Sequence, residues 1–379
     1  AGAHEYRVDR NFLEWSPGGQ IHVFEGPLGR GALWMEMGDG KTRKIKYVMY
    51  DDSMEPARHL QNSRRLVSKD GIFAMSGSAG TGANLASRPY YNSEGVPQVF
   101  LFTGGPMLGA KPDVEKFPMT MLGVLAYNTE AALYAKFIKE NFPNAKVALL
   151  NDDSGGPFFS KAFVQAAKDL GVNIVIHEEH SYSEPTIDAK IDRLAASGAD
   201  VFVDATTPKY VIQAIKRMSA VNWNPKHVVW GVGASIGGTL IPAGADLSKG
   251  IYTSLWLKDQ ANPGFANDDD MKLYVEKLKK YDSSLNPADQ FNAIGWIFCN
   301  ATKAVLENTK QPTRKAFVDA MRNMSQVKVP LLLNGVTLTT KGSDDGYPIE
   351  SIQMGQFDGV KFVPIGGLID YEGKTPQPQ

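Results

Sequence analysis

The stretch that decides the fold is RKIKYVMYDDSMEPARHLQNSRRLVSKDGIFAMSGSAGT, residues 43–81. In it, short β-branched runs flank an amphipathic segment, a pattern typical of a parallel sheet with helical crossovers. The same alternation continues for one more helix and one more strand. The predicted elements are strands at 44–52, 72–78 and 96–105 and helices at 55–69 and 82–94. Together they predict one βαβαβ lobe.

A second series follows the stretch FPMTMLG, residues 117–123. Asn128 or Thr129 is expected to cap its first helix, which runs to Asn141. The remaining predicted elements are strands at 146–152, 172–182, 200–206, 227–233 and 250–257 and helices at 157–170, 186–197 and 208–221. This series predicts a second lobe of the same α/β kind.

The last third of the chain is expected to complete both lobes. Three helical segments come first, and then a strand and a hairpin that turns at Asp358 and Gly359. The predicted segments are helices at 268–281, 287–306 and 313–324, a strand at 336–340 and a hairpin at 352–365. The fold class predicted from the whole sequence is α/β, with two doubly wound lobes.

Composition places the chain among folded globular proteins, because 43% of its 379 residues are hydrophobic and 21% are charged. Forty Lys and Arg against 41 Asp and Glu leave a net charge of −1, so no basic surplus favours binding to nucleic acid or to an anionic membrane. No window approaches the roughly 18 apolar residues of a membrane span, and no signal-peptide pattern opens the sequence. We therefore expect a cytosolic protein or a mature exported one.

One motif suggests an enzyme. Gly233-Ala-Ser235-Ile-Gly237 is a G-x-S-x-G directly after a predicted strand, where an α/β-hydrolase carries its nucleophile. That fold requires a histidine after the serine in chain order. All the histidines precede Ser235: His4, His22, His59, His177, His180 and His227. Serine hydrolysis is therefore kept only as an alternative, and we expect a protein that is not an enzyme.

Two glycine-rich segments resemble phosphate-binding loops. SGSAGTG, residues 76–82, lies between a strand and a helix, so its N–H groups are placed to receive an anion, although its spacing is not G-x-G-x-x-G. Residues 38–42 resemble a phosphate loop, but Met35 stands where the motif requires glycine. Neither loop supports a nucleotide, and no cofactor is expected.

Metal and thiol chemistry are not expected either. His177 and His180 lie three apart on a predicted strand, where side chains face opposite sides, so we expect solvated surface. The paired acids, such as Asp51 and Asp52, are assigned to caps and turns. Cys299, the single cysteine, is predicted to be a buried inert thiol in a helix.

Small and hydroxyl residues follow successive predicted strands. Ligands of open parallel sheets bind outside the carboxyl ends of the strands, where small residues leave backbone amides and hydroxyls free. Nearby aromatic side chains are candidates for apolar walls of such a site. These aromatic residues are Phe102, Tyr127, Phe158, Tyr210 and Trp256.

From about residue 44 to residue 370 the sequence resembles the type I periplasmic binding proteins, in particular the branch that binds branched-chain amino acids for ATP-driven importers. The residues that carry the resemblance are those of 43–81, NSEGVPQVFLFTGG, KVALLNDDSGGPFFSKAF and IDRLAASGADVFVDATTPKYVIQAIKRM. The resemblance implies two lobes joined by three crossings, with a ligand cleft between them that closes about a hinge. It places lobe 1 at 1–124 plus 257–333 and lobe 2 at 125–256 plus 334–379.

The resemblance also implies where a ligand carboxylate binds. The first ligand loop matches Ala79 to Thr81, with the Thr81 hydroxyl at the position that holds the carboxylate, and a second loop matches Gly104 and Gly105. The predicted ligand-binding residues are Ser78, Ala79, Gly80, Thr81, Phe102, Thr103, Gly104, Gly105, Tyr127, Ser154, Phe158, Thr206, Thr207, Gly233, Ser235 and Trp256.

Three positions depart from the family pattern. Ser154 and Thr206 stand near positions that the family fills with aromatic residues, and Gly233 stands near an acid that holds an amino group. The missing acid argues against an α-amino acid, because a buried ammonium without a carboxylate is costly. The missing aromatic walls favour a bulkier ligand, and we expect an aromatic or otherwise apolar carboxylate. A glutamate introduced at Gly233 is expected to admit an amino acid.

The first 43 residues fit the family poorly, so its first strand and helix are expected to be shortened or rearranged. The expected function is that of a monomeric solute-binding receptor that serves a membrane permease of an ABC importer. The resemblance places it in the periplasm, or outside the cell on a tether, with no insertion into the membrane. The alternatives are binding of branched-chain or other amino acids, the sensor domain of a regulator, and serine hydrolysis.

Overall fold

The computed structural model describes residues 7–15, 21–25, 33–36, 38–45, 48–53 and 55–378. It divides into two compact units of mixed α/β structure, which confirms the predicted fold class. Unit 1 consists of residues 1–126, 267–287 and 291–349, and unit 2 of residues 127–266, 288–290 and 350–379. The main crossings follow Ala126, Ala266 and Ile349.

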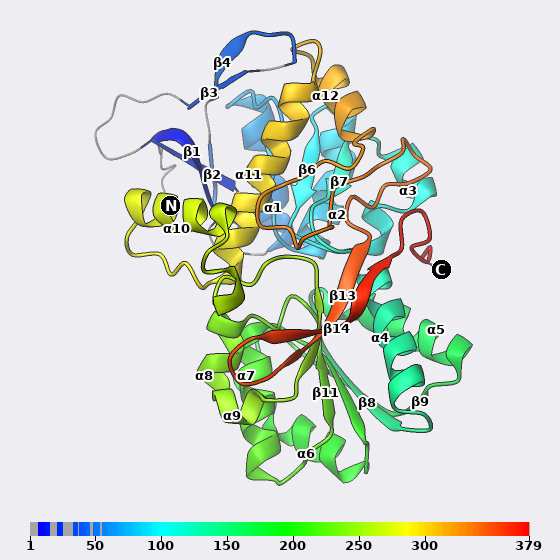
Figure 1. The fold of residues 1–379 in the computed structure, drawn as a ribbon. Helices are drawn as coiled ribbons and strands as arrows, with labels where there is room; N and C mark the ends of the chain where they lie inside the picture. The colour runs from blue at the N-terminus through cyan, green and yellow to red at the C-terminus, as the bar shows by residue number, and fades with distance from the viewer. Residues whose placement is uncertain are drawn as a thin grey trace. The chain divides into compact units, whose positions relative to one another are not determined.

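Unit 1 contains a parallel sheet in the order β5-β6-β7, in which α2 crosses from β5 to β6, and α1 precedes β5 (Figure 1). These elements are β5 (Met75–Ser76), β6 (Gln98–Leu101), β7 (Thr120–Leu122), α1 (Pro56–Ser68) and α2 (Thr81–Ser93). Apolar side chains of these elements and of the segments that follow them form one core. The buried members of this core are Met75, Tyr91, Val96, Leu101, Leu108, Leu122, Ala126 and Tyr347. The two helices and the strands β5 and β6 lie where the sequence predicts them.

The strands of unit 1 are shorter than predicted. β5 ends at Ser76 because Gly77 and Gly80 have φ angles of +79° and +87°, which turn the chain out of the extended conformation. An isolated bridge, Ala79↔Phe102, continues the parallel pairing beyond the strand ends. The sequence analysis missed β7, a three-residue strand that directly follows Pro118 and Met119.

The N-terminal region contains two antiparallel pairs, β1 with β2 and β3 with β4. Their bounds are β1 (Arg7–Trp15), β2 (Ile21–Glu25), β3 (Leu33–Glu36) and β4 (Thr42–Ile45). The strand predicted at 44–52 is only partly observed, as the end of β4 and a bridge residue at Met49, and its residues 46–47 lie outside the described part of the chain.

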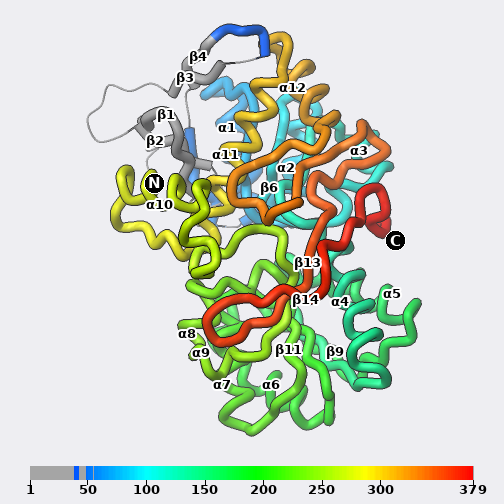
Figure 2. The backbone as a smooth tube through the Cα atoms, in the orientation of Figure 1, coloured from blue at the N-terminus to red at the C-terminus, as the bar shows by residue number. Residues whose placement is uncertain are grey.

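Residues 267–287 and 291–349 return to unit 1, as the yellow and orange segments of Figure 2 show. The remaining elements of unit 1 are η1 (Pro106–Leu108), α3 (Lys111–Lys116), α10 (Asp269–Tyr281), α11 (Gln290–Asn308) and α12 (Arg314–Met321). Residues 334–349 also belong to unit 1, whereas the sequence analysis assigned them to the second lobe. The reason is local bonding: the Tyr347 hydroxyl donates to Pro106 O at 2.8 Å. The predicted strand at 336–340 is reduced to one bridge, Val327↔Leu338, because Thr340 N bonds Met324 O in a loop.

Unit 2 is built on a seven-stranded sheet in the order β14-β13-β12-β11-β10-β8-β9. The strands from β12 to β9 are parallel, and β13 and β14 form the predicted antiparallel hairpin. The strands are β8 (Lys146–Asp152), β9 (Asn173–His180), β10 (Val201–Ala205), β11 (Lys226–Val229), β12 (Tyr252–Leu255), β13 (Ser351–Phe357) and β14 (Phe362–Asp370). The helices are α4 (Tyr127–Asn141), α5 (Gly156–Leu170), α6 (Asp188–Ala196), α7 (Pro208–Ala220), η2 (Ile236–Leu240), α8 (Ile241–Ala243), α9 (Ala245–Ser248) and η3 (Pro263–Phe265).

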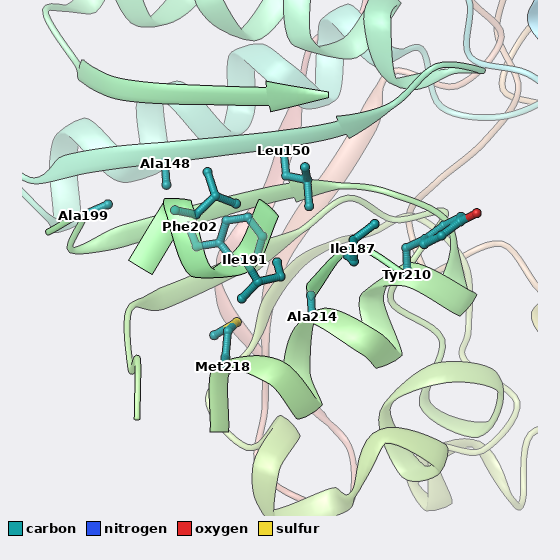
Figure 3. Packing of buried hydrophobic residues seen from close by; sticks show 10 residues of the cluster. Ala148, Leu150, Ile187, Ile191, Ala199, Phe202, Tyr210, Ala214 and Met218 are labelled. Atoms are coloured by element: carbon teal, nitrogen blue, oxygen red, sulfur yellow. The ribbon is translucent and has the colours of Figure 1, made fainter. Parts of the chain in front are cut away.

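Helices cover both faces of the unit 2 sheet. Ala148 and Leu150 of β8 and Phe202 of β10 point toward Ile191 of α6 and Met218 of α7, as Figure 3 shows. Because side chains alternate across a strand, the neighbouring residues of β8 and β10 face the opposite side, where α5 contacts both strands. Strands that are buried on both faces read as continuous apolar runs, which explains why the sequence predicted them well.

The segment at 257–266 belongs to unit 2, whereas the sequence analysis assigned it to lobe 1. Asp259 fixes it there. Its carboxylate accepts hydrogen bonds from Ile236 N at 3.0 Å and from Ala261 N at 2.9 Å. Burial raises the pKa of Asp259 to about 6, although both hydrogen bonds lower it.

Phe202→Ala is expected to lower the free energy of unfolding of unit 2 by roughly 3–5 kcal/mol, because it leaves a cavity in a close-packed core. The ring packs against Trp223 and His227, with centroid distances of 5.2 and 4.7 Å. Urea unfolding measures the change. Val175→Ala on the edge strand β9, where the side chain is 40% exposed, is the control and should cost less than about 1 kcal/mol. Equal losses in the two variants would contradict this packing.

Asp259→Asn should change how stability depends on pH. The folded-state pKa of about 6 is above the unfolded value of about 3.9, so the stabilising contribution is complete below pH 3.9 and is lost as the pH rises through 6. Relative to the variant, the wild type should lose about 2 kcal/mol of unfolding free energy between pH 4 and pH 7. Urea unfolding at four pH values checks this, and parallel curves for the two proteins would refute it.

Candidate functional site

The predicted ligand loops of unit 1 meet where β5 and β6 end. The bridge Ala79↔Phe102 places the two loops side by side. The Thr81 and Thr103 hydroxyl oxygens are 2.6 Å apart, and Gly105 N donates to the Thr103 hydroxyl at 3.1 Å. The structure therefore brings together all the predicted residues of this unit, which are Ser78, Ala79, Gly80, Thr81, Phe102, Thr103, Gly104 and Gly105.

The packing between these loops explains why a glycine follows Thr103. A Cβ atom at Gly105 would lie 2.7 Å from Thr81 Cγ2, so any other residue here would displace the Thr81 side chain. Ser78 is buried, and its hydroxyl oxygen has no hydrogen-bond partner among the described residues. The ring of Phe102 packs against Phe291, so this aromatic residue supports the loop from the side of α11.

The donors at this point of unit 1 are uncharged. They are hydroxyls and backbone N–H groups, and α2 begins at Thr81, so the positive end of its dipole lies at the loop. An anion can be held by such fixed dipoles, with charge-assisted hydrogen bonds of about 1.5–3 kcal/mol each. The arrangement is therefore suited to a carboxylate.

In unit 2, two predicted hydroxyl residues bond to the strand that precedes them. Ser154 donates to Asp152 Oδ1 at 2.7 Å, and Thr206 donates to Asp204 Oδ1 at 2.6 Å. Both aspartates are fully buried at the ends of their strands. The hydroxyls thus shape the loops after β8 and β10, and burial raises the pKa of Asp152.

Trp230 is a residue that the sequence analysis missed. Its indole Nε1 donates to Thr206 O at 2.6 Å, and its ring lies 5.2 Å from the ring of Tyr127. A Cβ atom at Gly155 would lie 3.2 Å from the indole, and one at Gly233 would lie equally close to it. Trp230 therefore fills space beside the loops after β8 and β10. The sequence did not single out Trp230 as a site residue, because the strand predicted at 227–233 included it, whereas β11 ends at Val229.

The expectation that Gly233 can be replaced by glutamate is wrong. A Cβ atom there would lie 2.7 Å from Thr206 O and 2.9 Å from Val211 Cγ2. The first contact is with backbone, which cannot move away cheaply. Gly233 is thus required by close packing, and its identity says less about the ligand than the family resemblance implied.

Glu130 is a second residue that the sequence analysis missed. Its Oε1 accepts hydrogen bonds from Gly231 N at 2.6 Å, from the Ser254 hydroxyl at 2.5 Å and from the Tyr134 hydroxyl at 2.8 Å. Burial raises the pKa of this carboxyl group, and the hydrogen bonds lower it. Since Glu130 lies within a helix, nothing in its spacing distinguished it from a solvated acid.

The remaining predicted residues of unit 2 have different environments. Trp256 is buried and lines a small cavity of about 20 Å³ with Ser254, Asp259 and Gln290. Phe158 is half-buried in the first turn of α5. Thr207 is the N-cap residue of α7, and its buried hydroxyl has no partner among the described residues.

Ser235 is a helix cap in this structure. Its hydroxyl accepts a hydrogen bond from Gly238 N at 3.0 Å at the start of η2. None of the histidines whose side chains are described hydrogen-bonds to Ser235; His227, for example, contacts Asp204. The geometry offers Ser235 no general base.

A different serine does have the contacts of a hydrolase triad. His59 Nδ1 lies 2.6 Å from Asp52 Oδ2, and His59 Nε2 lies 2.9 Å from the Ser87 hydroxyl. All three side chains are completely buried, and Gln98 also donates to the Ser87 hydroxyl. A substrate cannot reach this serine, so the cluster is part of the core. Asp52, which the sequence analysis assigned to a cap or turn, is the buried partner of this histidine.

The prediction for the HEEH segment is correct for His177 and wrong for His180. His177 is exposed on β9, whereas His180 is 1% exposed and its ring lies 4.1 Å from that of Tyr210. The two residues face opposite sides of the strand, as expected, but the last residue of the strand turns toward the core. Cys299 is buried as predicted, which raises the pKa of its thiol.

Comparisons with known proteins identify the family. The model of the periplasmic binding protein family matches residues 34–361. An amino acid binding protein of Pseudomonas aeruginosa is 25% identical over 160 residues, which cover 42% of this chain and 41% of that protein. The match thus spans about two fifths of that relative's length. Among the described residues, no helix has the length and hydropathy of a membrane-spanning segment.

Solved structures share the fold. A branched-chain amino acid ABC transporter protein of Thermus thermophilus with bound valine has a TM-score of 0.75 at 19% identity, over 85% of each chain. A solute-binding protein of an ABC transporter of R. palustris in complex with benzoate has a TM-score of 0.71 at 16% identity, over 90% of each chain. At these identities the likeness shows the fold alone. Because the family model matches most of the sequence, the chain belongs to the periplasmic binding protein family.

Proposed function

We propose that this chain is an extracytoplasmic solute-binding receptor of an ABC importer and that its ligand is a small aromatic or otherwise apolar carboxylate. The observation that carries the proposal is the group of uncharged donors in unit 1, where the Thr81 and Thr103 hydroxyls and Gly105 N lie within hydrogen-bond distance of one another. Membership of the periplasmic binding protein family supports the receptor role.

The ligand class follows from the charges near the loops. No Arg or Lys is present in residues 78–81 or 103–105, so an anion there would be bound by dipoles. In unit 2, the buried acid Glu130 already accepts three hydrogen bonds, which leaves it poorly suited to hold a ligand ammonium. The benzoate complex of the R. palustris protein shows that this fold accommodates an aromatic carboxylate.

The presence of Trp230 reduces the ligand size that we expect. The absence of aromatic residues at Ser154 and Thr206 favoured a bulkier ligand, but the buried Trp230 indole packs beside the loops that carry these two residues. We therefore propose a ligand of one aromatic ring, with Tyr127 and Trp256 among the candidates for its apolar wall. Binding of a branched-chain amino acid is the competing proposal. It is supported by the T. thermophilus protein, which has the same fold and was solved with bound valine.

Thr81→Val is expected to weaken carboxylate binding about 5- to 150-fold, or 1–3 kcal/mol, because it removes one hydroxyl donor. Calorimetry with benzoate, phenylacetate, L-valine and L-leucine identifies the ligand and measures the change. Thr309→Val is the matched control: this buried threonine of unit 1 donates to Val305 O at 2.7 Å and touches neither loop. The Thr309→Val variant should bind the carboxylate with the same affinity as the wild type.

Two results would contradict the proposal. If only the amino acids bind, the ligand class is wrong. If Thr81→Val binds benzoate as tightly as the wild type, the hydroxyl is not part of the site. Both variants should keep the unfolding temperature of the ligand-free protein within a few degrees of the wild-type value.

We further propose that loops of unit 2 supply part of the ligand contacts, so that binding favours a more compact arrangement of the chain. Small-angle X-ray scattering with and without saturating benzoate should show a smaller radius of gyration in the complex. An unchanged radius at saturation, verified by calorimetry, would rule out closure.

A further inference from the structure

Asn84 of α2 connects the core of unit 1 to the first candidate ligand loop. Its side-chain Nδ2 donates to Ser78 O at 3.0 Å and to Gly80 O at 2.8 Å. The residue is completely buried. One amide group therefore bonds two of the carbonyls of the loop at 78–81, in addition to the backbone hydrogen bonds from Phe102 N to Ser78 O at 2.8 Å and from Asn84 N to Gly80 O at 3.2 Å.

The orientation of this amide is fixed by Gln98. Gln98 Nε2 donates to Asn84 Oδ1 at 3.1 Å, so the acceptor end of the asparagine faces β6 and its donor end faces the loop. The glutamine is oriented in turn, because its Oε1 accepts a hydrogen bond from the Thr120 hydroxyl at 3.1 Å and its Nε2 donates to the Ser87 hydroxyl at 3.0 Å. A flipped amide at either position would place like atoms against each other.

The network ends at the buried pair His59 and Asp52. His59 Nδ1 donates to the Asp52 carboxylate at 2.6 Å, and the opposite nitrogen contacts the Ser87 hydroxyl at 2.9 Å. These side chains come from α1 and the residues just before it, and Ser87 comes from α2. A fully connected buried polar network specifies a single arrangement, since any broken link leaves a polar group unpaired.

This anchoring determines where the loop donors point. The C=O and N–H groups of a trans peptide point in opposite directions. Holding the carbonyls of Ser78 and Gly80 against Asn84 therefore directs the N–H groups of Ala79 and Thr81 away from it. We infer that Asn84 is the positioning residue of the carboxylate-binding loop, held in place by Gln98, Ser87, His59 and Asp52. The inference rests on the function proposed above.

The test compares Asn84→Ala with Asn92→Ala. Asn92 lies on the same helix and makes part-buried contacts to Met119 and to Thr120, whose hydroxyl also bonds Gln98, but Asn92 does not bond the loop carbonyls. It therefore controls for disturbance of the far end of the network. Hydrogen exchange of the full chain is measured at residues 79–81 without ligand, and the dissociation constant is measured for benzoate. Asn84→Ala should raise exchange at 79–81 roughly tenfold more than Asn92→Ala and should weaken benzoate binding roughly tenfold at equal overall stability.

Each outcome decides between positioning and general stability. Equal exchange at 79–81 in the two variants would overturn the inference, because the loop would then not depend on Asn84. If the wild type does not bind benzoate, the proposed ligand class fails, while the exchange experiment still decides the role of Asn84. If Asn84→Ala does not fold, Ser87→Ala serves instead: it removes one support of Gln98, and exchange at 79–81 should rise about threefold over Asn92→Ala.

Discussion

Parallel pairing of two short strands determines the candidate site of unit 1. Parallel strands end at the same edge of a sheet, so the loops after β5 and β6 must meet there. The bridge Ala79↔Phe102 carries this pairing one step beyond the strands, and the contact between Thr81 and Thr103 follows from it. Glycines at 77 and 80, with positive φ angles, then turn the chain from the strand into α2. The donors are thus placed by backbone geometry and need no charged side chain.

In unit 2, by contrast, buried acids lie at the ends of two strands. The aspartates that end β8 and lie in β10 are buried and accept hydrogen bonds from the hydroxyls of their own loops. Trp230 packs beside these loops. A Cβ atom at Gly233 would lie 2.7 Å from Thr206 O, and one at Gly155 would make tight contacts with Tyr127 and the indole. The loops of this unit are therefore closely packed on an aromatic residue and buried acids.

Much of this architecture could be predicted from the sequence. Buried parallel strands such as residues 146–152 are continuous apolar runs, and helices such as 208–220 carry a strong amphipathic pattern. β7 could not be predicted, because three residues show no periodicity. The unit boundaries near 257 and 334 depended on single long-range contacts, those of Asp259 and Tyr347, which no local pattern reveals.

In the candidate site too, some residues could be predicted from a local pattern and others could not. The glycine-rich loops of unit 1 were recognisable because their composition reflects backbone geometry. Trp230, Glu130 and Asn84 were not, because a tryptophan after a strand, or a glutamate or asparagine within a helix, has many ordinary explanations. Their roles follow from partners that lie from six to about 120 residues away in the sequence. The contacts that fix such groups are tertiary, and only the folded chain reveals them.

The central claim is that uncharged donors of the loops at 78–81 and 103–105 hold a carboxylate. The most direct measurement is an NMR titration of the isotope-labelled protein with benzoate, following the amide protons of these loops. The account predicts large downfield shifts at Ala79, Thr81 or Gly105 that saturate with the calorimetric dissociation constant. If benzoate binds and these amides do not shift while amides elsewhere do, the carboxylate is held in another place and the claim is wrong.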